Sequence, residues 1–293
     1  MKFILPLFFS ATFFFSCSNA ENKNERADSI PDSTTISTNA ENSPGIISND
    51  SLDAAGIEFG FCDMDGKRML MLTDSLPDPL LFTKVFSADY KLTDIRYLTK
   101  RKATAEDNGR ENEFNFKNCK GYLYEVKENA VTRDHSVIFM TPAFISARKI
   151  IPLQPPTKKE LSPAIKSRIE SGKNRKIKDY RCLTSLGKDS AVYLFAFENK
   201  GDSALASLAY ITTGKIVYED FPALWNDMST WRVDDGGNFG VEYFDLLAVF
   251  EKNGKLEIVT DWPGAEGKNT EYLREDGGTF KSLKQQGRYT APD

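Results

Sequence analysis

Closely spaced turn signals divide the C-terminal part of the chain into short apolar runs. In residues 243–283 the turns at Asn253-Gly254, 263–267 and 276–278 separate four runs rich in β-branched and aromatic residues. Asn-Gly and Asp-Gly between such runs are typical of tight β-hairpins. Residues 243–283 are therefore predicted to fold as an antiparallel meander.

The same pattern recurs upstream. Strand-like runs occupy residues 57–98 and 122–151, and residues 177–220 predict a second four-stranded meander. Residues 99–120 are mostly polar and predict a long exposed loop, and residues 221–228 predict a short helical turn.

One short helix is expected near residues 158–172. Pro152 and the prolines that follow it mark a stiff linker, after which Ser162 can cap a helix and Pro163 can open it. Ile165 and Ile169 then share one face. The many Lys and Arg residues of the segment indicate a solvated surface helix, with contact to acidic lipid as the alternative.

These patterns predict a mainly β fold (β-rich α+β) of antiparallel meanders, arranged as two lobes or as a partial propeller-like array. The predicted parts are a signal peptide (1–16), a lipidated flexible tether (17–50), an N-terminal β-rich lobe (51–151), a Pro-rich linker with a basic helix (152–178) and a C-terminal β-meander lobe (179–293).

The N-terminus has the layout of an export signal, because Lys2 is followed by an apolar run that ends in small residues. This run is shorter than the ~20 residues that cross a bilayer. The ending FFSC at Cys17 resembles the lipobox of bacterial lipoproteins, in which the Cys becomes the lipidated first residue. The resemblance implies an outer-membrane lipoprotein of the cell envelope, on the periplasmic or the surface face. An ordinary cleaved signal with a coincidental Cys is the alternative.

Residues 18–50 are polar and almost without aromatic residues, so they cannot bury enough apolar surface to offset ordering. Asp-Ser/Thr-hydrophobic triplets in this tether resemble the O-glycosylation sequon of some Gram-negative exported proteins. The resemblance implies glycosylation of Ser29 and Ser33. A third triplet begins at Asp50, and chance explains any single one.

Charge and cysteine content exclude several classes of function. With 38 basic against 42 acidic residues the chain has no overall basic field, so nucleic-acid binding is not expected. Besides Cys17 the thiols are Cys62, Cys119 and Cys182, of which Cys62 and Cys119 are the predicted disulfide partners. With no CxxC and with His135 as the one histidine, neither a metal site nor a cofactor is predicted.

The segment LLAVFEKNGKLEIVTDWPGAEG resembles the calcium-loop hairpin of FG-GAP-type repeats and of many exported bacterial proteins. The loop positions here are 250–254, which lack the calcium-ligating aspartates and include Lys252. Hard cations need several oxygen ligands. The hairpin is therefore expected without calcium, with Asn253-Gly254 as a type I′ turn.

Tryptophans and carboxylates gather in the same part of the chain. If the meander brings the WRVDDGGNF loop beside the DWPGAEG turn, aromatic faces and carboxylates share one rim, as sugar and peptide sites require. The predicted ligand-binding residues are Trp231, Asp234, Asp235, Asp261, Trp262 and Glu266.

The leading hypothesis is a noncatalytic, lipid-anchored envelope protein that binds a glycan, a peptide or an envelope partner protein. One alternative is a hydrolase of envelope polysaccharide with Asp235 and Glu266 as its carboxylate pair, which requires carboxyl groups ~5 to 9.5 Å apart. Another is a structural subunit of an envelope assembly.

Overall fold

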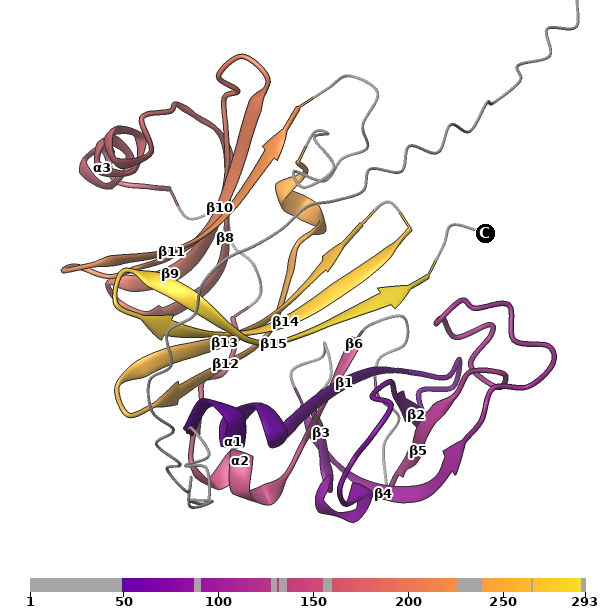
Figure 1. Ribbon diagram of the computed structural model, residues 1–293. Helices are drawn as coiled ribbons and strands as arrows, with labels where there is room; N and C mark the ends of the chain where they lie inside the picture. The colour runs from indigo at the N-terminus through magenta and orange to yellow at the C-terminus, as the bar shows by residue number, and fades with distance from the viewer. Residues whose placement is uncertain are drawn as a thin grey trace, which may run out of the picture. The chain divides into compact units, whose positions relative to one another are not determined.

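The computed structural model describes residues 49–86, 91–127, 131, 136–154, 160–225, 239–264 and 266–290. These residues belong to one compact unit, in which strands form a closed barrel and a curled nine-stranded sheet (Figure 1). The predicted mainly β fold is confirmed, and the strands lie in these two sheets rather than in propeller-like blades.

The barrel is built from the first six strands in the order β1-β2-β5-β4-β3-β6, with every neighbouring pair antiparallel. Successive side chains of a strand point to opposite faces, so one set fills the interior and the other packs outside. The strands are β1 (Ile57–Cys62), β2 (Arg68–Met71), β3 (Lys84–Phe86), β4 (Leu92–Arg101), β5 (Gly121–Val126) and β6 (Ser136–Met140).

The nine-stranded sheet contains both predicted meanders, which are confirmed. A single parallel bridge between Tyr218 and Thr279 joins β11 to β15, and all other strand pairs are antiparallel. The strands are β7 (Lys149–Ile150), β8 (Ile177–Gly187), β9 (Ser190–Phe197), β10 (Ser203–Ile211), β11 (Ile216–Leu224), β12 (Asp245–Lys252), β13 (Lys255–Pro263), β14 (Gly267–Asp276) and β15 (Thr279–Tyr289).

The curl of the sheet brings distant strands together on its concave face. In sheet order β14 and β15 separate β13 from β11, yet the rings of Trp262 on β13 and Phe221 on β11 lie 5.5 Å apart. An apolar core that includes Leu208 and Ile258 fills this face. Another core packs the barrel strands β1 and β6 against β12 and β13.

The predicted helix is confirmed as α3 (Pro163–Lys173). The Ser162 side chain accepts a hydrogen bond from the Ile165 N–H at 3.3 Å, and Asn174 ends the helix in the left-handed conformation. Ile169 is fully buried against the sheet. The short helices are α1 (Asn49–Ala55), α2 (Pro142–Ser146), η1 (Pro79–Leu81) and η2 (Val241–Tyr243).

Two local predictions are wrong, and a third holds only in part. Residues 142–146 form α2 instead of a strand, because Thr141 caps a turn that Pro142 opens. Strand β11 continues to Leu224, where a helical turn was predicted. The connection after β4 is a loop with residues 102–106 exposed, as predicted, but its second half is not, since three asparagines there lie buried in a hydrogen-bonded cluster. These are Asn112, Asn115 and Asn118.

The predicted disulfide between Cys62 and Cys119 is contradicted, because both residues are buried thiols in the structure. Cys62 points into the barrel with Met69, whereas its neighbour Phe61 points outward and packs with Cys119. The alternation of side chains along β1 therefore places the two sulfur atoms on opposite faces of the barrel wall.

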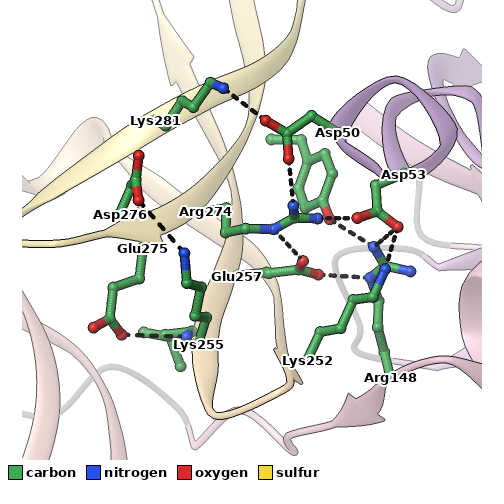
Figure 2. A network of polar contacts seen from close by, with 12 residues as sticks. Asp50, Asp53, Arg148, Lys252, Lys255, Glu257, Arg274, Glu275, Asp276 and Lys281 are labelled. Carbon is green, nitrogen blue, oxygen red and sulfur yellow. Dashed lines mark hydrogen bonds and ion pairs between the residues drawn. The ribbon is translucent and has the colours of Figure 1, made fainter. Parts of the chain in front are cut away.

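A buried ionic network fixes α1 to the nine-stranded sheet (Figure 2). The Arg148 side chain is 1% exposed and pairs with Asp53 at 2.7 Å and with Glu257 at 2.6 Å. Arg274 contacts the same two carboxylates. Burial opposes ionisation of Asp53, but hydrogen bonds from Lys252, Arg148 and Arg274 outweigh it and lower its pKa to about 2.

The network changes the predicted boundary of the tether. Residues 49 and 50 were assigned to the flexible tether, but α1 begins at Asn49. Asp50 accepts from Arg274 at 2.8 Å and from Lys281 at 2.6 Å. The rest of the predicted tether, with Cys17, Ser29 and Ser33, lies outside the described residues.

Candidate functional site

A cleft of about 520 Å³ opens where β13, β14 and β15 end. We call it the Trp262 cleft. Its wall combines one indole with carboxylates, amides, cations and glycines. The lining residues are Glu111, Trp262, Gly264, Glu266, Gly267, Lys268, Asn269, Gln285, Gly287, Arg288 and Tyr289.

The turn between β13 and β14 forms one side of the cleft. Gly264 donates to the carbonyl of Gly267 at 2.5 Å, and Thr290 donates to the carbonyl of Glu266 at 2.9 Å. A Cβ atom at Gly267 would lie 2.2 Å from the carbonyl oxygen of Arg288. Only glycine lets the turn approach β15 this closely, so the DWPGAEG turn is held at the cleft rim.

The structure separates two neighbouring residues that were predicted to share the site. Trp262 lies on the concave side and lines the cleft, and 9% of it is exposed. Asp261 points to the opposite face, where it accepts from Ser136 at 2.9 Å and from Thr270 at 2.8 Å. The prediction that Asp261 belongs to the same binding rim is therefore wrong, because adjacent residues of a strand face opposite sides.

Two amide side chains that were not predicted form the inner wall. Gln285 donates to the Oδ1 atom of Asn269 at 3.0 Å. Asn269 is only 8% exposed, and its Nδ2 atom has no hydrogen-bond partner in the described part of the chain. A buried donor without an acceptor costs about 1 to 3 kcal/mol. Asn269 lines the cleft, so this unpaired donor lies in the cleft wall.

Glu111 closes the cleft from a distant part of the sequence. Its backbone N–H donates to the carbonyl of Tyr289 at 2.6 Å, and its carboxylate accepts from the Tyr289 N–H at 3.2 Å. Burial raises the pKa of Glu111. The sequence carries no local signal for this contact, whereas the Asp276 to Gly278 turn does imply that Asn269 and Gln285 lie on paired strands.

Several predicted site residues lie outside the described residues. They are Trp231, Asp234 and Asp235, so their part in the rim stays a prediction. The same holds for the hydrolase hypothesis, because Asp235 is one of its two carboxylates. Of the predicted binding residues, Trp262 and Glu266 lie in the cleft.

The hairpin that resembles a calcium loop has the predicted turn. Asn253 and Gly254 have φ values of 53° and 74°, as a type I′ turn requires.

Metal sites and membrane-spanning helices were also sought among the described residues. Among the residues that the structure describes, no group of three His, Cys, Asp or Glu residues is arranged to hold a metal ion. None of the described helices has the length and apolar character needed to cross a bilayer.

A scan against protein-family models and searches of curated proteins and of solved structures found no match to this chain. Function is therefore inferred from the chemistry of the cleft. Its indole can contact an apolar ring face, its amides can donate, and its carboxylates can accept hydrogen bonds.

Proposed function

We propose that this protein is a noncatalytic, lipid-anchored module of the cell envelope that binds a glycan in the Trp262 cleft. The observation that carries the proposal is the Nδ2 donor of Asn269, which is buried without an acceptor in the described residues and belongs to a cleft-lining residue opposite Trp262 in the register of β13 and β14. A ligand that supplies an acceptor there removes the cost of that buried donor.

A glycan fits this cleft because each hydroxyl group both donates and accepts. One sugar can accept from Asn269 and donate to the carboxylates of Glu111 or Glu266, all of which line the cleft. Gly287 leaves its part of the wall without a side chain and has open space at its Cβ position, so a sugar ring has room in the cleft there. The apolar face of an indole ring suits contact with the apolar face of a sugar ring.

Gly287 provides the sharpest test of the cleft. It lies opposite Asn269 in the register of β14 and β15, and a Cβ atom built on it meets nothing within 4 Å. Gly287→Leu should therefore fill the cleft without straining the backbone. Gly214 in the turn between β10 and β11 also has an open Cβ position, so Gly214→Leu is the matched control.

The experiment screens the purified protein against a glycan array and then measures the hits by titration calorimetry. Wild type and Gly214→Leu should bind the same glycan, and Gly287→Leu should bind it at least tenfold more weakly. An array without hits would contradict the proposed function. Equal binding by Gly287→Leu would show that the glycan binds elsewhere.

The anchoring part of the proposal rests on the export signal and the lipobox-like ending at Cys17. Growth with an alkyne-labelled fatty acid should label the wild-type protein in its native host, and Cys17→Ser should abolish the label. A labelled Cys17→Ser variant would contradict anchoring at this residue.

A further inference from the structure

Two carboxylates lie on the concave face near the Trp262 cleft, and one of them, Glu271, is opposite the cleft residue Gln285 in the register of β14 and β15. Glu271 lies two residues after Asn269 on β14, so both point to the same side. Glu219 lies two residues before Phe221 on β11, and the Phe221 ring contacts Trp262. Glu219 and Glu271 therefore lie on the same concave face as Trp262 and Asn269. We call them the inner carboxylates.

Within the described residues the inner carboxylates, one buried and one half-buried, have no cationic partner. Glu271 is 8% exposed, and among the described residues its side chain has a hydrogen bond with Ser282 on β15. Glu219 is half-buried. Burial, followed by repulsion from Glu271 and from Asp220, raises the pKa of Glu219 to about 7. Neither carboxylate forms an ion pair with a Lys or Arg of the described chain.

Other buried carboxylates of this protein have cations. Glu257 pairs with Arg148 and Arg274, and Glu275 pairs with Lys215. Buried acidic groups without such partners destabilise the free protein, and a ligand that brings positive charge offsets that cost. The inner carboxylates are thus complementary to a cationic group.

The sheet opens beside these residues. Strands β11 and β15 are joined at Tyr218 and Thr279 only. Beyond that bridge, residues 219–224 pair with β10 alone and residues 280–289 pair with β14 alone. Glu219 is the first residue of β11 past the bridge, so it lies on the part of β11 that has no backbone pairing to β15 among the described residues.

We propose that Glu219 and Glu271 bind a protonated amine of the ligand, so that the protein selects glycans with free amino groups. An ammonium group has three N–H donors and one positive charge, which match two carboxylates and the open acceptor positions on them. The Nδ2 donor of Asn269 is an independent indication that this face receives a ligand. The inference rests on the proposed glycan-binding function.

The test compares two ligands that differ only in the amine. Glucosamine and N-acetylglucosamine tetramers of the same linkage are titrated into the purified protein at pH 7, where Glu219 and the free amine are each partly charged and where binding of the ammonium group to the carboxylate favours the charged form of both. The glucosamine tetramer should bind at least tenfold more tightly. Glu219→Gln and Glu271→Gln should each reduce this preference several-fold, and the double variant should abolish it.

Glu251 supplies the matched control, because it lies exposed near the end of β12, and Glu251→Gln should keep the full preference. Glu219 is half-buried and tolerates substitution better, so Glu219→Gln decides the result if Glu271→Gln does not fold. Equal affinity for the two tetramers would overturn the amine inference and leave glycan binding intact. If neither tetramer binds, the amine inference and the proposed glycan-binding function are both overturned.

Discussion

Two acidic regions on opposite faces of the nine-stranded sheet differ in whether the described chain supplies them with cations. In the network of Figure 2, Asp53 and Glu257 are each contacted by Arg148 and Arg274. On the concave face the inner carboxylates have no cation in the described chain. We infer that the paired carboxylates stabilise the fold, whereas the inner carboxylates can bind a ligand.

The largest expected effect comes from breaking the paired region. Arg148→Met leaves Asp53 and Glu257 with fewer positive partners, and loss of one member of a buried pair costs about 3 to 5 kcal/mol. Urea denaturation at pH 7 should show this loss in the free energy of unfolding. The control is Arg96→Met, because Arg96 pairs with Glu125 at the surface and exposed pairs contribute about 0 to 1 kcal/mol. Equal losses for both variants would contradict the comparison.

A smaller effect is expected from the pH dependence of the same network. Asp53 has a pKa of about 2 in the folded protein against a usual 3.8, so its stabilisation is present above pH 4 and is lost as pH falls through 2. Asp53→Asn should therefore be destabilised by about 2 kcal/mol at pH 7. The difference from wild type should shrink toward pH 2 in urea denaturation, and a constant difference would contradict this origin.

The smallest effect has the opposite sign and comes from the inner carboxylates. The pKa of Glu219 is raised from 4.5 to about 7, so ionisation of Glu219 destabilises the folded protein as pH rises through 7, and this penalty is absent below about pH 4. Glu219→Gln should stabilise the protein at pH 8 by about 1 kcal/mol, since solvent screens a half-buried group.

The melting temperatures of wild type and Glu219→Gln, measured at pH 8 and pH 4, check this sign. The advantage of the variant should disappear at pH 4, and Glu251→Gln should show no advantage at either pH. Destabilisation of Glu219→Gln at pH 8 would mean that the Glu219 carboxylate supports the fold.

Local signals predicted the strands and the helix well. The turn at Asn253-Gly254 and the cap at Ser162 depend on the conformational preferences of a few adjacent residues, and the structure confirms both. Local signals predicted only part of the binding site. Of the predicted binding residues, Trp262 and Glu266 lie in the cleft, but Asp261 faces away from it.

The remaining residues of the site depend on contacts between distant segments. Glu111 reaches the cleft through its bonds to Tyr289, and Glu219 nears Glu271 only because the sheet curls. Asp50, which was assigned to the tether, is bonded to Arg274 and Lys281. No pattern within a short window of sequence records such pairings.

The β-rich class, the two meanders and the helix after Ser162 follow from short segments of sequence, because turn chemistry and the alternation of apolar residues act within a few residues. In contrast, long-range packing puts the meanders into one curled sheet and sets which carboxylates receive a cation. The sheet arrangement and the ion pairs depend on which strands meet across the concave face. The residues that bury or neutralise a given carboxylate there are far apart in the chain.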